Sequence, residues 1–242
     1  GQFLVFSGPN PATGKQNIGI IDLVKERKKG PVRQHKQGNF QVKKYKPTIT
    51  YIDSQYDCYA PAVSSNGKMI VYHRTLDSTT KTSPKELVRY DVEPKTKKLI
   101  SAPNGHAMFP SLSADDRYVA YVSKRAGQWD IHRIDLWNGA EAQVTDDPEM
   151  EFTPIFAPDD SIYFTRFDAG TVNVPSEIGI FHLSKDQVFK STQFPTPKEF
   201  LNVKGISEYV PSFSGVSDVV IDSLKSFPKP ERSSFGAIYH NQ

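Results

Sequence analysis

Hydrophobic and polar residues alternate along this chain in short runs, and the pattern is clearest between residues 108 and 136. That stretch reads MFPSLSADDRYVAYVSKRAGQWDIHRIDL. It contains an apolar run interrupted by a proline, then a pair of aspartates, then two runs that alternate with a period of two. Such alternation is typical of half-buried β-strands, because successive side chains of a strand point to opposite faces. The stretch therefore predicts three consecutive strands, and no window of the chain shows a helical period.

The same pattern recurs along the chain in four copies. Each copy has an aromatic or apolar approach to a proline and a small residue three positions after it. The anchoring residues are Pro61, Pro110, Pro154 and Pro211. A period of roughly 40 to 50 residues with several strands in each unit is typical of β-propeller blades.

A polar turn separates the first two predicted strands of the units. The turns contain Asn66-Gly67, Asp115-Asp116 and Asp159-Asp160. These residue types form turns because glycine allows a positive φ and because Asn and Asp side chains hydrogen-bond to nearby backbone. Calcium loops need an alternation of the form Asp-x-Asp-x-Asp-Gly, which is absent here. We therefore interpret the aspartate pairs as turn residues, and we expect Asp130 and Asp135 to hold strand ends and turns.

We predict an all-β chain that folds as a single β-propeller domain over residues 1–242, with five blades of three to four antiparallel strands. The predicted blades cover residues 1–46, 57–104, 105–148, 149–200 and 206–242, with a linker at 47–56. The first blade lacks an inner strand, and the last ends after a third strand at 235–239. A six-bladed ring, incomplete in this chain, is the alternative, because units that start and stop midway leave ring closure unexplained.

The most regular copy resembles a known repeat family. The residues SKRAGQWDIHRIDL from Ser123, preceded by FPSLSADD from Phe109, are similar to the TolB-type, WD40-like propeller repeat. The resemblance implies a propeller, with the six-bladed TolB ring as the alternative, and an extracytoplasmic location, periplasmic or secreted. Related peptidases also carry a hydrolase domain with a Gly-x-Ser-x-Gly motif, which this sequence lacks. One propeller fold serves many unrelated tasks, so the resemblance leaves the function open.

Charge is distributed unevenly. Residues 25–46 contain nine Lys and Arg residues and one acid, Glu26, whereas the rest of the chain carries 21 basic and 26 acidic residues. The proposed basic surface comprises Lys25, Arg27, Lys28, Lys29, Arg33, Lys43 and Lys44. It could be an outer blade edge on which lysines block strand pairing, or it could bind an anionic polysaccharide or an acidic protein. Nucleic acid is disfavoured, since Phe40 and Tyr45 are the only interleaved aromatics.

A second candidate site lies where the inner strands begin. In a propeller these positions converge on one mouth of the central channel, and here they hold Asp57, His106, Glu151 and Glu208. Three carboxylates and an imidazole could bind a divalent cation such as calcium, manganese or zinc. They could also bind a basic side chain of a partner, act as acid and base on a sugar, or be solvated loop residues. The sequence names no certain cofactor and no catalytic residue.

Several smaller observations bound the function. Cys58 is the only cysteine, so an internal disulfide is impossible. No apolar stretch reaches the roughly 20 residues that a membrane-spanning helix needs. We expect structural or surface roles for His132 and His182. Trp129 and Trp137 could each stack on a sugar or fill a gap between blades.

The favoured hypothesis is a non-catalytic, monomeric binding platform for a protein or an anionic polysaccharide. One alternative is a metal-assisted lyase or glycosidase acting on an acidic polysaccharide, which would use His106 with Glu151, Glu208 or Asp57. A further alternative is a propeller domain of a larger multidomain protein.

Overall fold

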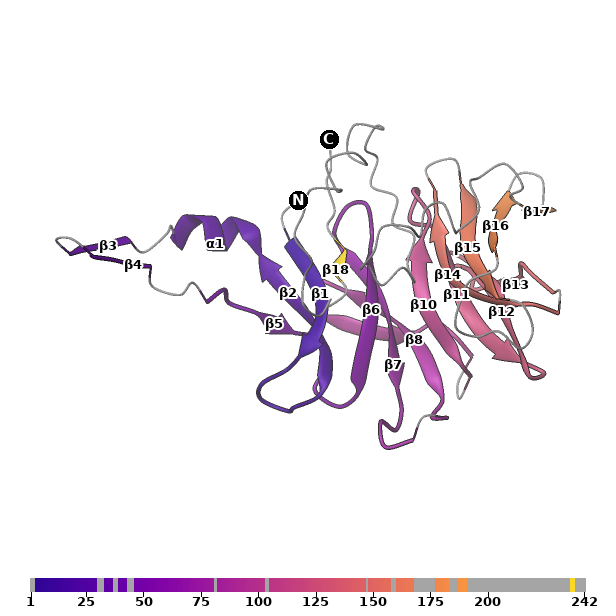
Figure 1. Cartoon of the computed structure of the whole chain (residues 1–242), viewed down its shortest axis with the longest axis horizontal. Coiled ribbons are helices and arrows are strands. Elements are labelled where there is room, and N and C mark those ends of the chain that lie inside the picture. The colour runs from indigo at the N-terminus through magenta and orange to yellow at the C-terminus, as the bar shows by residue number, and fades with distance from the viewer. Residues whose placement is uncertain are drawn as a thin grey trace.

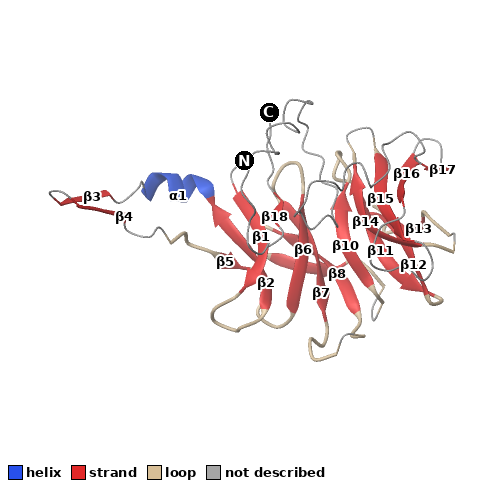
Figure 2. Ribbon diagram, viewed as in Figure 1, coloured by secondary structure: helices blue, strands red, loops and turns tan. Residues whose placement is uncertain are grey.

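The computed structural model consists of four-stranded antiparallel sheets that stand side by side (Figures 1 and 2). It describes residues 3–29, 33–36, 39–42, 46–80, 82–102, 105–146, 148–157, 160–167, 177–182, 187–190 and 236–237. Four such sheets lie within this part of the chain. Within the same residues, no helix is long and apolar enough to cross a membrane.

The first sheet has the strand order β18-β1-β2-β5. Its strands are β1 (Phe3–Pro9), β2 (Gln16–Asp22), β5 (Thr50–Tyr51) and β18 (Gly236–Ala237). We expected residues 235–239 to form a third strand of the last unit. Instead, Gly236 pairs with Phe6, so that β18 occupies the inner position that the first unit lacks in its own sequence.

The other three sheets follow chain order, as the repeat predicts. The second contains β6 (Asp57–Val63), β7 (Met69–Thr75), β8 (Lys85–Asp91) and β9 (Thr96–Leu99). The third contains β10 (Ala107–Leu112), β11 (Tyr118–Arg125), β12 (Gln128–Asp135) and β13 (Glu141–Gln143). The fourth contains β14 (Met150–Phe156), β15 (Ser161–Phe167), β16 (Glu177–His182) and β17 (Gln187–Lys190). The predicted last unit, residues 206–242, lies outside the described residues apart from β18.

The inner strands of the second, third and fourth sheets bend at their anchoring prolines. The registers of β6, β10 and β14 shift there, so that two residues oppose one on the partner strand. The residue before each proline has a positive φ: 48° at Ala60, 52° at Phe109 and 50° at Thr153. A positive φ is uncommon outside glycine, and such bulges re-aim a strand. The repeated prolines of the sequence therefore correspond to one bend that recurs in three sheets.

The sheets pack face to face through apolar side chains. One cluster, which includes Ile18, Cys58 and Tyr72, joins the first two sheets. A second joins the second and third sheets through Val71, Leu87 and other residues, and a third joins the third and fourth sheets. Burial of this area supplies the main driving force for stacking the sheets.

The hairpin turns predicted at Asn66-Gly67 and Asp115-Asp116 are confirmed. Gly67 and Asp116 have φ values of 70° and 60°. The Asp115 carboxylate accepts hydrogen bonds from the Ser113 hydroxyl at 2.6 Å and from the Arg117 backbone N–H at 3.0 Å. Asp115 thus acts as a turn residue, as the absence of a calcium-loop pattern indicated.

The basic segment is an excursion from the first sheet, not its outer strand. After β2 the chain forms α1 (Leu23–Lys29) and a hairpin of β3 (Arg33–Lys36) and β4 (Asn39–Val42), which reach away from the sheets (Figure 1). The outer strand of the sheet is β5, within the residues predicted to be a linker. The interpretation of the lysines as edge blockers of an outer strand was therefore wrong.

The short helix α1 also departs from the prediction of no helix, because seven residues are too few to show a helical period. Its start does carry a local signal. The Asp22 carboxylate accepts a hydrogen bond from the Lys25 N–H at 2.9 Å, which is the geometry of an N-cap.

Candidate functional site

The positions predicted at the channel mouth have different surroundings. Asp57 is buried at the start of β6 and accepts a hydrogen bond from the Gln16 N–H at 2.7 Å, which links the first two sheets. His106 is half-buried just before β10. Glu151 is fully buried in β14, and Glu208 lies outside the described residues. In the part of the chain that the structure describes, no three His, Cys, Asp or Glu side chains lie close enough together to hold a metal ion.

Glu151 belongs to a buried ion pair. Its Oε1 lies 3.1 Å from Nε of Arg166 on the adjacent strand β15, and both side chains are at most 1% exposed. The Thr145 hydroxyl donates to the other carboxylate oxygen at 3.1 Å from the preceding sheet. A buried carboxylate requires such compensation, because removing an ion from water is costly. This pair and Thr145 thus occupy the buried space where the third and fourth sheets meet.

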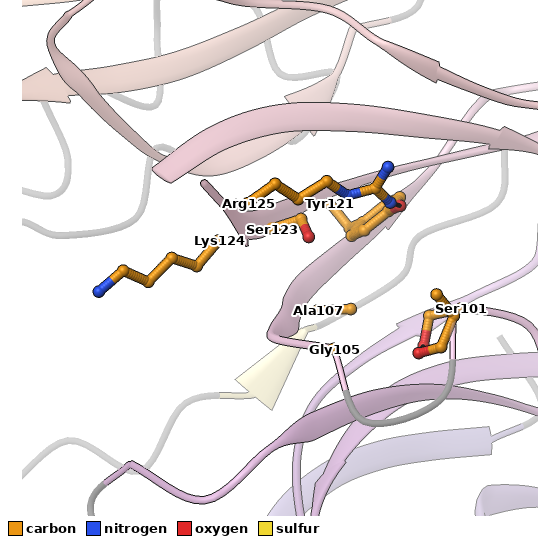
Figure 3. Close-up of a pocket in the computed structure, with 8 residues that line it drawn as sticks. Ser101, Gly105, Ala107, Tyr121, Ser123, Lys124 and Arg125 are labelled. Carbon is orange, nitrogen blue, oxygen red and sulfur yellow. Dashed lines mark hydrogen bonds between the residues drawn. The ribbon is translucent and has the colours of Figure 1, made fainter. Parts of the chain in front are cut away.

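The equivalent place between the second and third sheets contains a small pocket instead. It has a volume of about 50 Å³ and is lined by Ser101, Ala102, Gly105, Ala107, Tyr121, Ser123, Lys124 and Arg125 (Figure 3). Such a volume can hold a few water molecules or one small polar group. In Figure 3 the Arg125 side chain extends toward Tyr121, and its guanidinium donates to the phenol oxygen at 3.3 Å.

Strand register explains why the pocket forms at this cleft. Cys58 pairs with Arg74 in the second sheet, and Glu151 pairs with Arg166 in the fourth. In the third sheet the same row holds Ala107 paired with Ser123. Two small side chains thus stand where the neighbouring sheets each have an arginine, and the space between the sheets is left open.

Positive charge gathers beside this pocket around His106. The His106 carbonyl accepts a hydrogen bond from the Lys124 N–H at 3.2 Å, and Lys85 forms a backbone bridge to His106 from the second sheet. The pKa of His106 is lowered first by burial and then by Lys85 and Lys124. Within the described residues, neither of these ammonium groups has a carboxylate partner. This edge of the cleft is therefore suited to a negatively charged group.

The helix α1 carries a second group of exposed cations. Its single acid, Glu26, is buried and lies 2.6 Å from Lys29 Nζ, and its carboxylate also accepts the Thr48 N–H at 3.2 Å. Arg27 and Lys28 are exposed, and no partner for either side chain lies in the described part of the chain. Since the one acid is neutralised internally, the outer surface of α1 is positively charged. Of the other predicted basic residues, Arg33 lies in β3, whereas Lys43 and Lys44 lie outside the described residues.

Two histidines are buried where the sheets meet. The His73 ring lies between the rings of Tyr59 and Phe109, with centroids 5.5 Å and 5.4 Å away. Burial lowers the pKa of His73 to about 3, with a smaller effect from Lys85. Burial and the nearby Arg125 lower the pKa of His132 to about 4. The structure thus gives His132 a place in the core, as predicted, whereas the side chain of His182 is not among those described.

The two tryptophans lie at opposite ends of the third sheet. Trp129 is half-buried and packs on Phe152 of the fourth sheet, with ring centroids 5.5 Å apart. It therefore fills a gap between sheets, which was one of its two predicted roles. Trp137 lies in the turn after β12 and is 76% exposed.

The fold is similar to that of β-propeller proteins. A protein assigned as TolB from Agrobacterium tumefaciens matches with a TM-score of 0.59 and 17% identity, over 78% of this chain and 61% of that protein. TolB from Acinetobacter baumannii matches with a TM-score of 0.54 and 19% identity, over 78% and 41%. An oligogalacturonate lyase from Vibrio parahaemolyticus matches with a TM-score of 0.54 and 12% identity, over 81% and 50%.

These likenesses establish the architecture and nothing finer. No protein-family model and no curated protein sequence matches the chain. The chain spans about three fifths of the first of these structures and about half or less of the other two. Its antiparallel sheets resemble propeller blades, as the repeat predicted. Because TolB and a lyase share this fold, function has to be argued from the residues of this chain.

Proposed function

We propose that this chain is a non-catalytic binding platform for a partner that presents a row of carboxylates, either an acidic polysaccharide or an acidic protein surface. The observation that carries the proposal is the one-sided charge of α1. Among the residues that the structure describes, exposed Arg27 and Lys28 have no carboxylate partner, while Glu26, the only acid of the helix, is buried against Lys29. A row of exposed cations raises the local concentration of an anionic partner and speeds its association.

Two ammonium groups beside His106 support the same partner chemistry at a second place. Lys124 lines the pocket between the second and third sheets, and Lys85 forms a bridge to the adjacent His106. The Ser123 hydroxyl makes no hydrogen bond within the described residues. A carboxylate at this edge would receive charge-assisted hydrogen bonds, which are stronger than neutral ones. A rigid stack of sheets loses little conformational entropy when such contacts form.

We also propose that the ring has five blades. Residues 191–235, between β17 and β18, form a stretch as long as one repeat, and β18 supplies the inner strand of the first sheet. A fifth sheet built from these residues would complete a ring of five blades. An experimental structure that showed six sheets, or a partner chain between the first and fourth sheets, would overturn this count.

The binding proposal is tested by reversing charge on α1. The variant Arg27→Glu/Lys28→Glu should weaken binding to polygalacturonate or to polyglutamate by about tenfold or more at 0.15 M salt, where only charges within roughly 8 Å act strongly. The matched control, Lys95→Glu/Lys98→Glu, makes the same charge change on exposed residues of the second sheet. The two probes distinguish a polysaccharide from an acidic protein.

Equal affinities of the helix variant and the control for both probes would refute the role of α1. The absence of measurable binding to either probe by the unmodified chain would refute the proposal as a whole. Tighter binding to single-stranded DNA of the same charge would identify nucleic acid as the partner, against the proposal.

A further inference from the structure

The turn that carries Trp137 has an equivalent turn in the second sheet, and the two can be compared residue by residue. The same hydrogen bond fixes both turns, since the Val92 N–H donates to the Lys68 carbonyl and the Leu136 N–H donates to the Arg117 carbonyl, each at 2.8 Å. Lys68 is therefore equivalent to Arg117. The residue that follows Val92 is Glu93, and the residue that follows Leu136 is Trp137.

The two turns hold different pairs at this equivalent position. In the second sheet Lys68 Nζ lies 3.6 Å from the Glu93 carboxylate, and both side chains are largely exposed. In the third sheet the Arg117 guanidinium lies 4.5 Å from the centre of the Trp137 ring. In the second sheet this turn therefore forms with an exposed ion pair in place of the aromatic contact. The fold therefore does not need the indole that stands at this position in the other.

The backbone of the turn and one side of the exposed ring have defined partners. The backbone N–H of Trp137 donates to the Asp135 carboxylate at 2.9 Å. Arg117 donates to the other oxygen of that carboxylate from Nε at 3.1 Å and from Nη2 at 2.7 Å. The same guanidinium also lies 4.8 Å from the centre of the Tyr118 ring. Arg117 therefore supports one side of the indole, and the 76% exposure of Trp137 shows that most of the ring faces solvent.

The surroundings of Trp137 are polar. Among the described residues, the only other large exposed apolar side chains are Val24 on α1 and Leu99 on β9. Protein-binding hot spots usually lie within packed patches that exclude water, and the described residues form no such patch around this ring. Gly139, two residues further along the turn, has open space around the position of a Cβ. An isolated flat ring with polar neighbours suits a ligand that is apolar on one face and polar at its edges.

We propose that Trp137 is a stacking site for an uncharged sugar ring of a carbohydrate chain. The apolar face of a pyranose would lie on the open side of the indole, while its hydroxyls would remain in contact with water and with the polar groups of the turn. The local charge favours an uncharged ligand, because Asp115 and Asp116 lie in the neighbouring turn and Arg117 is already neutralised by Asp135. This site is separate from the anion-binding surface of α1, and neither proposal depends on the other.

The test measures binding of neutral hexasaccharides made of glucose, galactose, mannose or N-acetylglucosamine, by tryptophan fluorescence and calorimetry. One of them should shift the emission of the exposed tryptophan and protect it from quenching by acrylamide. Trp137→Glu, which copies the second sheet, should weaken that binding by about tenfold or more, as expected for the loss of one stacking contact. Trp137→Phe keeps an aromatic ring and should retain most of the affinity.

Two controls separate sugar stacking at Trp137 from a loss of fold and from binding at α1. Trp137→Glu should change the melting temperature by less than about 2 °C, since the substituted residue is exposed. The α1 variant Arg27→Glu/Lys28→Glu should bind the neutral sugar as the unmodified chain does. The inference is overturned if no neutral hexasaccharide of the panel binds, if Trp137→Glu binds equally well, or if the ring instead captures hexagalacturonate or a protein in preference to the neutral sugars.

Discussion

The second and third sheets are built on one plan and differ at both ends. At one end the second sheet has Arg74, which donates to Glu86 at 2.8 Å and lies over the Tyr56 ring, whereas the third sheet has Ser123 and a pocket. At the other end the second sheet has the pair Lys68–Glu93, and the third has Arg117 stacked on Trp137. The backbone hydrogen bonds are alike in both sheets. Side chains at equivalent positions are therefore free to vary. The pocket and the exposed Trp137 of the third sheet are features that the second sheet forms without.

The largest expected effect on stability comes from replacing the arginines at the equivalent register position of the second and fourth sheets, Arg74 and Arg166. Arg166→Met should lower the free energy of unfolding by about 3–5 kcal/mol, because it leaves Glu151 buried without its cation. Arg74→Met in the second sheet should cost less, about 1–2 kcal/mol, since the Arg74 side chain is 21% exposed and water can reach the site. Urea denaturation of the two variants measures the difference.

The double variant Glu151→Leu/Arg166→Met serves as the control. Replacing both members of a buried pair by apolar residues of similar size is often neutral, so most of the lost stability should return. If Arg166→Met and Arg74→Met lower the free energy of unfolding by the same amount, the difference in burial between the two arginines has no effect on stability.

The second prediction concerns pH and the histidine between these two sheets. The pKa of His73 is about 3 in the folded chain, against roughly 6.5 in an unfolded one. Between these values the unfolded state binds more protons, so stability is full above pH 6.5 and falls as the pH is lowered toward 3. The slope contributed by one histidine is at most about 1.4 kcal/mol per pH unit.

His73→Phe should flatten the decline in stability between about pH 6.5 and 4.5, measured by urea denaturation at several pH values. The decline should not vanish, because the pKa of His132, about 4, contributes in the same range. Substitution of His106, which is half-buried and lies at the pocket edge, should change the slope less. A curve for His73→Phe parallel to that of the unmodified chain would contradict the assignment.

The smallest expected effect comes from filling the pocket. Ala107→Val adds two carbon atoms next to a space of about 50 Å³ and should raise the free energy of unfolding by about 0.5–1 kcal/mol. Ala120 is also buried in the third sheet but faces the close-packed cluster shared with the fourth. Ala120→Val should therefore destabilise the chain by about 1–3 kcal/mol through overpacking. Thermal melting of the two variants decides whether the cleft between the second and third sheets has spare room.

Local signals made much of the fold predictable. Period-two alternation, the spacing of the prolines and the turn residues were enough to predict strands, hairpins and the repeat, because each depends on residues close together in the sequence. The helix α1 was missed although Asp22 marked its start, since one cap residue without a helical period is a weak signal. The outer strand β5 was also missed, because two residues after a long excursion carry almost no pattern.

The candidate sites were less predictable than the strands. Glu151 was expected at an open mouth, and the structure gives it a buried partner on the adjacent strand. Nothing in the sequence indicated that Arg166 pairs with Glu151, since fifteen positions separate the two residues. Trp129 and Trp137 looked alike in the sequence, eight positions apart on a strand and its following turn. Only the neighbouring sheet distinguishes them, by covering one and leaving the other exposed.

The sequence by itself determined the strand pattern, the turns, the repeat and the uneven distribution of charge. These properties follow from side-chain periodicity and from backbone preferences that act over a few residues. The tertiary structure alone decided where a pocket forms between sheets, where an arginine fills the equivalent space, and which tryptophan remains exposed. Those outcomes depend on the fit between adjacent sheets, which is set by side-chain volume and charge brought together from residues distant in the chain.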